Sequence, residues 1–160
     1  MAPYLAAAWL NSRLWTSRQP APVQVADGVW LGRMQTRREM ATGRFAGLLD
    51  LTAELPAPQG GWSYLNRPWL DLVPPTSAEL VLAADAIDTL RRQGPLLVCC
   101  ALGYSRSAAA VAAWLLRTGR AGGIDEAVQL IAACRPPVVL GAAHRAALQG
   151  ALADPKAAHG

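Results

Sequence analysis

Alternating apolar and polar residues predict strands in the first part of the chain. Residues 23–34, VQVADGVWLGRM, alternate around an Asp-Gly pair and are typical of a β-hairpin. Residues 45–52, FAGLLDLT, form an apolar run that indicates a buried strand. Residues 62–72 continue in extended form until Pro74 and Pro75 end the pattern.

Helical spacing dominates the rest of the chain. Residues 76–92 combine a Thr or Ser cap, a glutamate in the first turn and arginines in the last, as helices do. The wholly apolar residues 94–100, GPLLVCC, predict a central parallel strand covered on both faces. The predicted helices span residues 36–42, 76–92, 105–118, 124–134 and 142–152. Strands that alternate with helices predict an α/β domain whose central, mostly parallel, twisted sheet has about four to five strands flanked by helices.

Length and composition favour one compact domain. The chain has 160 residues, of which 52% are hydrophobic and 16% charged, enough for a substantial core. We expect this domain to cover residues 21–153, with a flexible tail over residues 154–160. Residues 1–20 carry an apolar stripe and are expected to form a helical segment that either packs on the domain or faces a membrane. The apolar stretch is too short to span a bilayer and lacks the order of a signal peptide.

Charge and cysteine content exclude several classes of protein. Three cysteines and two histidines provide neither a regular disulfide framework nor a cluster of metal ligands, which favours a reducing compartment. The net charge of +4 comes from arginines spread along the chain. This distribution suits an anionic substrate, whereas nucleic acid would need a denser basic patch.

Residues 100–107, CALGYSRS, are the main candidate for chemistry. They follow the apolar strand and precede a helix, so their backbone N–H groups can surround a tetrahedral anion at the positive end of the helix dipole. Gly103 allows backbone torsions that a side chain would forbid, and Arg106 offers a planar fork for two phosphate oxygens. In that field the thiol of Cys100 should ionise readily and attack phosphorus.

This arrangement resembles the Cys-x5-Arg-Ser/Thr signature of the cysteine-dependent protein tyrosine phosphatase superfamily. The late position of the loop, the short chain and the preceding residues 67–75, RPWLDLVPP, resemble the dual-specificity branch. Residues 27–33, DGVWLGR, residues 48–54, LLDLTAE, and residues 134–140, CRPPVVL, also look like segments of that family. The resemblance covers roughly residues 23–152.

The resemblance implies a phosphatase that works through a phosphocysteine intermediate and requires no metal or cofactor. Cys100 would be the nucleophile, Arg106 the clamp on the transition state and Ser107 the group that helps the thiolate leave. Asp71, upstream in residues 68–75, PWLDLVPP, matches the general acid on a mobile loop. The substrate phosphate would be held by Ala101, Leu102, Gly103, Tyr104, Ser105 and Arg106.

The chain departs from the family at one position. Cys99 stands where the family usually has a histidine that orders the loop, so we expect a weaker or differently tuned nucleophile. The adjacent thiols also permit a second interpretation, in which Cys99 captures an oxidised Cys100 in a strained disulfide. Otherwise Cys99 is a small buried strand residue, and Cys134 is structural.

Several residues have simpler interpretations. Asp71 can be a turn residue before the next helix, and Asp85 and Asp88 are expected to be solvated on that helix. His144 is expected to be structural, and Arg135 to close a helix near the loop. Two other functions remain open: a pseudophosphatase that binds phosphorylated partners without turnover, and a rhodanese-like sulfurtransferase, which has no need of Asp71.

The loop also limits the substrate. Relatives that prefer polyphosphorylated inositol lipids tend to carry lysines in the loop, whereas this loop is neutral between Cys100 and Arg106. We therefore expect phosphotyrosine, phosphoserine or phosphothreonine in a protein, or a small or lipid phosphomonoester. The composition suggests a bacterial protein, and we expect a cytoplasmic monomer that can contact the membrane face through residues 1–20.

Overall fold

The computed structural model describes residues 21–138 and 140–154, together with residues 6, 7, 10, 14 and 17. The strands are β1 (Val23–Ala26), β2 (Val29–Arg33), β3 (Gly47–Thr52), β4 (Ser63–Trp69) and β5 (Leu96–Cys100). The helices are α2 (Arg37–Met40), α3 (Ser77–Leu90), the short 3-10 helix η1 (Arg91–Gln93), α4 (Arg106–Arg117), α5 (Ile124–Cys134) and α6 (Ala142–Ala153). The predicted order of strands and helices is confirmed.

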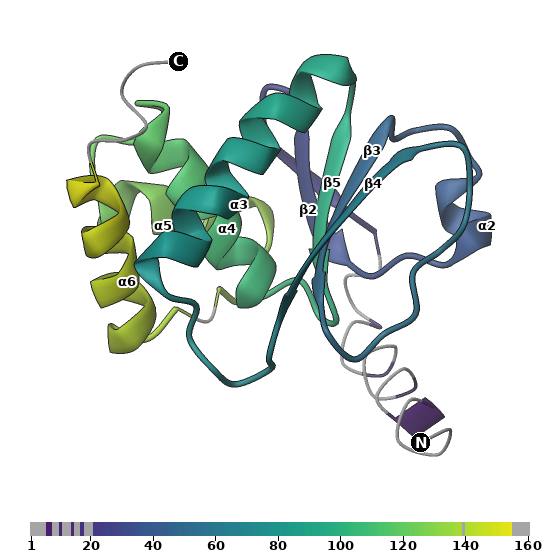
Figure 1. Ribbon diagram of the computed structural model, residues 1–160, viewed down its shortest axis with the longest axis horizontal. Helices are drawn as coiled ribbons and strands as arrows, with labels where there is room; N and C mark the ends of the chain where they lie inside the picture. Colours follow the sequence, from purple (N-terminus) through teal and green to yellow (C-terminus); the bar gives the residue numbers. More distant parts are fainter. Residues whose placement is uncertain are drawn as a thin grey trace.

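The five strands form one sheet in the order β1-β2-β5-β3-β4, in which only β1 is antiparallel to its neighbour. Helices α3 to α6 cover one face and α2 lies on the other (Figure 1). This is the predicted α/β fold with a mostly parallel sheet. Because β5 is central and parallel to both neighbours, the loops that follow β2, β3 and β5 leave the sheet at the same edge.

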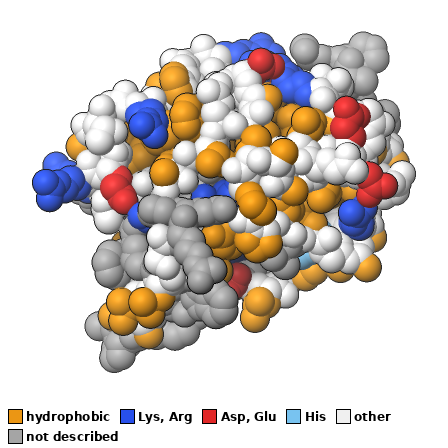
Figure 2. All heavy atoms as spheres, turned by 180° about the vertical axis from the view of Figure 1, so that it is seen from behind, with side chains coloured by type: hydrophobic (Ala, Val, Ile, Leu, Met, Phe, Trp, Pro, Cys, Tyr) orange, Lys and Arg blue, Asp and Glu red, His pale blue; other side chains and the backbone are white. Residues whose placement is uncertain are grey.

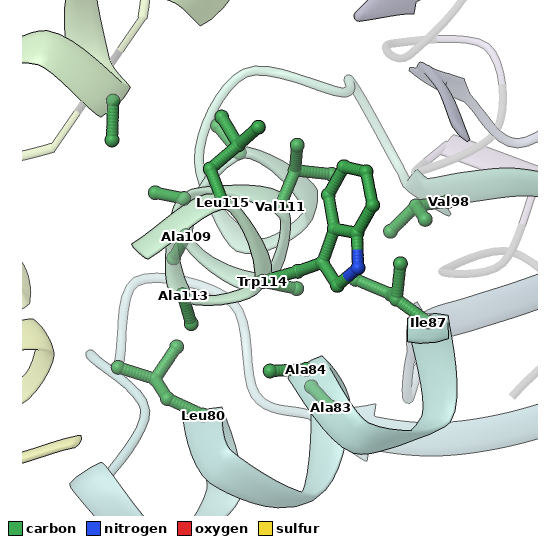
Figure 3. Close-up of a cluster of buried hydrophobic side chains, with 14 of the residues drawn as sticks. Leu80, Ala83, Ala84, Ile87, Val98, Ala109, Val111, Ala113, Trp114 and Leu115 are labelled. Carbon is green, nitrogen blue, oxygen red and sulfur yellow. The ribbon is translucent and has the colours of Figure 1, made fainter. Parts of the chain in front are cut away.

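The larger core lies between the sheet and α3 to α6. Helix α4 is buried from Arg106 to Leu116, and its alanines let neighbouring elements approach closely around Trp114 (Figure 3). The indole N–H of Trp114 donates to Asp88 on α3, which also accepts from Arg91 and Arg92. The expectation that Asp88 is solvated is therefore wrong, because a buried tryptophan needs a partner for its N–H.

The second core lies on the α2 face, and strand alternation divides β5 between the two. Leu96, Val98 and Cys100 face the helical core, whereas Leu97 and Cys99 belong to the other cluster. The cluster on the α2 face consists of Met34, Met40, Phe45, Leu48, Leu97 and Cys99. Two cysteines adjacent in sequence thus point to opposite sides of the sheet.

Two segments differ from expectation or lie outside the described part. The extended run predicted to continue through residue 72 ends at Trp69, because residues 71–73 form a turn. The predicted helical segment 1–20 falls mostly outside the described residues, as does the tail beyond residue 154. Within the described part of the chain, no helix combines the length and apolar character needed to cross a bilayer.

Candidate functional site

The loop between β5 and α4 folds around the sulfur of Cys100. The backbone N–H of Gly103 donates to Cys100 Sγ at 3.1 Å, and Ser107 Oγ lies 3.2 Å from the same sulfur. Cys100 is only 2% exposed, because it ends a buried strand at the base of the loop. The amide and the hydroxyl thus fix the position of the sulfur at the base of the loop.

Gly103 is required by the shape of the loop. Its φ is +78°, in the region that favours glycine, and a Cβ there would lie 2.4 Å from the carbonyl carbon of Gly32. The contact is with backbone of β2, which cannot move aside as a flexible side chain can. The glycine therefore lets the loop lie against β2 while its N–H points to the sulfur.

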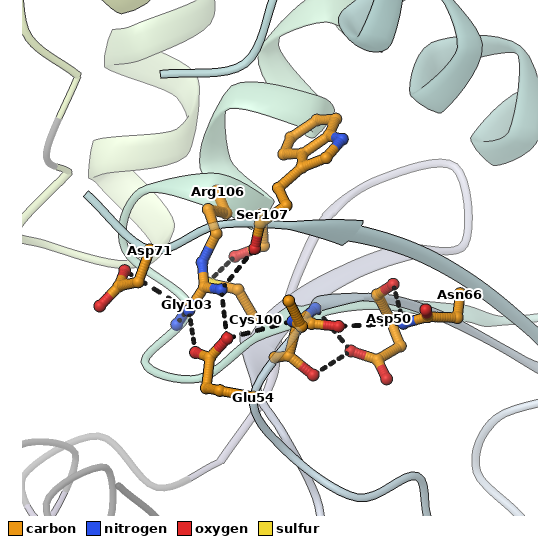
Figure 4. A network of polar contacts seen from close by, with 11 residues as sticks. Asp50, Glu54, Asn66, Asp71, Cys100, Gly103, Arg106 and Ser107 are labelled. Atoms are coloured by element: carbon orange, nitrogen blue, oxygen red, sulfur yellow. Dashed lines mark hydrogen bonds and ion pairs between the residues drawn. The ribbon is translucent and has the colours of Figure 1, made fainter. Parts of the chain in front are cut away.

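Arg106 begins α4 and is almost fully buried beneath the loop. Its guanidinium donates to both carboxylate oxygens of Glu54, at 2.9 and 2.5 Å, and to the carbonyl oxygen of Trp69 at 3.0 Å (Figure 4). Burial alone would raise the pKa of Glu54, but the hydrogen bonds and charge of Arg106 outweigh it, so that pKa lies below its ordinary value. Burial alone would lower the pKa of Arg106. The hydrogen bond to Glu54 and the negative charges of Cys100 and Glu54 have the larger effect, so the pKa of Arg106 is raised.

Asp71 reaches this cluster from the turn after β4. Its Oδ1 lies 3.5 Å from Nη2 of Arg106, while its side chain remains 65% exposed. The base of the turn is fixed because Trp69 is buried in the helical core and its carbonyl oxygen accepts from Arg106. The other end is fixed by Thr76, which forms a capping box with Glu79 at the start of α3. The structure thus brings the predicted acid beside the predicted clamp.

A second buried arginine supports the loop from outside. Arg135, which follows α5, donates to the carbonyl oxygens of Leu102 at 3.0 Å and Gly103 at 3.1 Å. Its guanidinium also lies over the ring of Tyr104, 4.8 Å from the centroid. These contacts hold the carbonyls of the loop outward, so that its N–H groups can face inward. Arg135 does close a helix near the loop, as predicted, and it also shapes the loop.

Helix α6 contacts the loop through His144. Nε2 of His144 lies 3.3 Å from the hydroxyl of Ser105, the residue at the N-cap of α4. Ser105 makes no side-chain capping bond, although serine usually caps helices, and this leaves the first amides of α4 without a side-chain acceptor from that residue. Burial lowers the pKa of His144, which favours the neutral ring.

Cys99, which replaces the expected histidine, lies on the far face of β5. Its sulfur contacts Met34 Sδ at 3.9 Å, and burial, followed by the charges of Asp50 and Cys100, raises its pKa. All three cysteines are free thiols. A Cys99–Cys100 disulfide would require the end of β5 to turn over, so the geometry speaks against the redox interpretation.

Sequence reasoning placed the loop and Asp71 but missed three supports. Glu54 enters the sequence analysis only as the last residue of the segment 48–54, and neither Arg135 nor His144 has a predicted contact with a particular loop atom. Glu54 could have been predicted, because it follows β3, the strand that pairs in parallel with β5. An acidic residue at the carboxyl end of β3 can therefore reach Arg106, which follows β5. Arg135 and His144 offer no local signal, since their contacts depend on how α5 and α6 pack.

Comparison with known proteins identifies a matching family and solved structures with a similar fold. Residues 29–151 match the catalytic domain of dual specificity phosphatases. Human DUSP28 is 26% identical, with a TM-score of 0.71 over 82% of this chain and 95% of that one. Tk-PTP in its active form is 21% identical, with a TM-score of 0.74 over 84% and 98% of the two chains. PTPMT1 in complex with PI(5)P is 20% identical, with a TM-score of 0.69 over 81% and 93%. A search of curated protein sequences finds no match.

Proposed function

The chain belongs to the family of dual specificity phosphatases, and from that premise we propose that it hydrolyses phosphomonoesters through a phosphocysteine intermediate. The observation that carries the proposal is the sulfur of Cys100, held by the Gly103 N–H at 3.1 Å and Ser107 at 3.2 Å. Asp71 lies 3.5 Å from Arg106, the first residue of the helix that follows the loop. These are the groups that nucleophilic attack, charge stabilisation and proton transfer require.

In the first step the thiolate of Cys100 attacks phosphorus. The S–P bond forms while the P–O bond to the organic group breaks, and Asp71 donates its proton to the departing oxygen. The phosphoryl oxygens carry negative charge that Arg106 and the loop amides stabilise. The alcohol leaves and a phosphocysteine remains.

In the second step water removes the phosphoryl group. Asp71, now a carboxylate, accepts a proton from water as the new O–P bond forms and the S–P bond breaks. Ser107 hydrogen-bonds to the departing sulfur, which leaves as the thiolate. Inorganic phosphate is released, and both Cys100 and Asp71 return to their starting states.

The loop favours substrates with a single phosphate group. Between Cys100 and Arg106 it contains only neutral residues, and Arg135 behind it is engaged with loop carbonyls. A polyphosphorylated group would lack additional cations in the loop itself. Phosphorylated tyrosine, serine or threonine and singly phosphorylated small molecules or lipids fit this description. Viewed from behind, basic side chains lie in separate places, which does not favour nucleic acid on that face (Figure 2).

The first experiment measures hydrolysis of p-nitrophenyl phosphate, without added metal, by the wild type, Cys100→Ser and Asp71→Asn across pH. We expect turnover by the wild type, its loss in Cys100→Ser and a reduced rate with an altered pH profile in Asp71→Asn. If the wild type binds vanadate but never turns over, the chain is a phosphate-binding module. Formation of thiocyanate from thiosulfate and cyanide would indicate a sulfurtransferase.

A further inference from the structure

The turn that carries Asp71 exposes apolar side chains on both sides of the acid. Leu70 is 67% exposed, Leu72 96% and Val73 53%, and we call these three residues the apolar lip. Single exposed leucines are common on protein surfaces. Three within four residues, on both sides of a candidate general acid, form an exposed apolar cluster in the turn beside the loop.

Packing against the described part of the chain does not explain the exposed side chains of the lip. Leu72 has a φ of +61°, in the left-handed region that glycine or asparagine normally occupies. A leucine in this conformation is unfavourable, and at 96% exposure it gains almost no burial in return. Since Trp69 and Thr76 anchor both ends of the turn, the lip is held outward and is not a frayed end.

The position of the lip restricts what can cover it. Asp71 must reach the ester oxygen of a phosphate seated in the loop, so residues 70–73 face whatever body carries that phosphate. A partner that covers three outward-pointing apolar groups must offer apolar surface close to the phosphate. In a bilayer, hydrocarbon lies directly beneath the phosphate headgroups, and apolar side chains can insert there without a preformed pocket.

We propose that the substrate is a lipid with a terminal phosphomonoester, which the enzyme meets at a membrane surface. The apolar lip inserts between acyl chains while the loop binds the headgroup phosphate, and this contact holds Asp71 over the ester oxygen. The reaction is the hydrolysis described above, with inorganic phosphate and a lipid alcohol as products. This inference rests on the proposed phosphatase activity.

The test compares a glycerol phosphate monoester in a membrane with the same group free in solution. Phosphate release is measured from phosphatidylcholine vesicles containing dioleoyl phosphatidic acid, from soluble glycerol 3-phosphate and from p-nitrophenyl phosphate. The variants are Leu72→Asn, which keeps a residue tolerant of positive φ, and Leu70→Ser combined with Val73→Thr. Leu82→Gln and Leu130→Gln are matched controls, because they remove exposed leucines from α3 and α5.

We expect the wild type to prefer the vesicles over glycerol 3-phosphate. Leu72→Asn should lower the ratio of vesicle to p-nitrophenyl phosphate rates by about tenfold, as expected for one leucine lost from an apolar contact. The two control variants should keep the wild-type ratio. An unchanged ratio in both lip variants would overturn the proposal, as would a soluble phosphotyrosine peptide that outcompetes the vesicles.

Sedimentation with vesicles separates this proposal from the proposed activity. If the wild type cleaves no p-nitrophenyl phosphate, the proposed hydrolysis fails, but binding can still be measured. If the wild type binds vesicles that contain phosphatidic acid and Leu72→Asn does not, the result supports insertion of the apolar lip into the membrane. Equal binding by the wild type and both lip variants contradicts it.

Discussion

The loop of residues 100–107 and the Asp71 turn lie next to each other but are built in opposite ways. The loop is half-buried, and three other parts of the chain hold it through Glu54, Arg135 and His144. The Asp71 turn is exposed, and Asp71 approaches the loop only through a 3.5 Å contact with Arg106. A loop held from several sides can preserve the geometry of attack, while an acid on an exposed turn stays accessible to the substrate.

The largest expected effect is the loss of the nucleophile. Cys100→Ser should lower phosphate release by at least about 10,000-fold, because a neutral serine hydroxyl is a much weaker nucleophile than a thiolate. The measurement is release of p-nitrophenol under saturating substrate. Cys134→Ser is the control, since this partly exposed thiol belongs to the end of α5 and not to the loop. Activity that survives in Cys100→Ser would assign the chemistry to another residue.

The rigidity of the loop is tested by adding one methyl group. Gly103→Ala should destabilise the protein by about 3 kcal/mol and abolish phosphate binding, because the new Cβ would overlap the backbone of β2. Gly119→Ala is a matched control: it has a similar φ of +71° and no atom within 4 Å of its Cβ. That change should destabilise the protein by only about 1 kcal/mol and leave turnover intact.

Thermal unfolding and phosphate titration would measure both glycine variants. Equal losses of stability would mean that only backbone torsion matters at these positions. The contact with β2 would then not define the shape of the loop.

The acid on the exposed turn should affect turnover more than binding. Asp71→Asn is expected to lower kcat by about 100-fold, because the leaving oxygen loses its proton donor. The affinity for inorganic phosphate should change little, and the alkaline limb of the kcat profile should disappear. Asp85→Asn, on the exposed side of α3, is the control. A loss confined to KM would show that Asp71 binds substrate and transfers no proton.

The ion pair beneath the loop predicts a pH dependence of stability. The pKa of Glu54 is lowered in the folded protein, so the ionised carboxylate stabilises the fold. This stabilisation is complete above pH 4.5, the ordinary pKa of the group, and is lost as the pH falls below that value. Glu54→Gln should therefore destabilise the protein by about 1 kcal/mol near pH 7 and have less effect near pH 3. Urea unfolding at both pH values measures this difference. A loss of equal size at both would exclude the ion pair as its cause.

The smallest expected effect concerns the contact from α6. His144→Ala should raise KM by about threefold with little change in kcat, because Ser105 loses a hydrogen bond that steadies the start of α4. His144→Gln can restore that bond and should recover most of the affinity. If both variants behave alike, His144 acts only by packing.

Local patterns were enough to predict the elements and to place the loop that follows β5. The apolar run that becomes β5, the Thr76 cap of α3 and the Cys100 to Ser107 spacing depend on neighbours in the chain, so they can be read directly. The end of β4 was misplaced, because residues 70–73 look apolar and extended although they turn outward. A hydrophobic residue usually indicates burial, and here it does not.

The sequence alone determined an α/β domain and the position of a candidate anion-binding loop, since hydrophobic periodicity, caps and loop residues act over a few positions. Only the tertiary structure decided what surrounds that loop. Glu54 lies 52 residues before its partner Arg106, and His144 lies 39 residues after Ser105. Contacts over such distances follow from strand order and helix packing, which local patterns do not encode. The strand pleat likewise separated Cys99 from Cys100, because successive side chains in a sheet point to opposite faces.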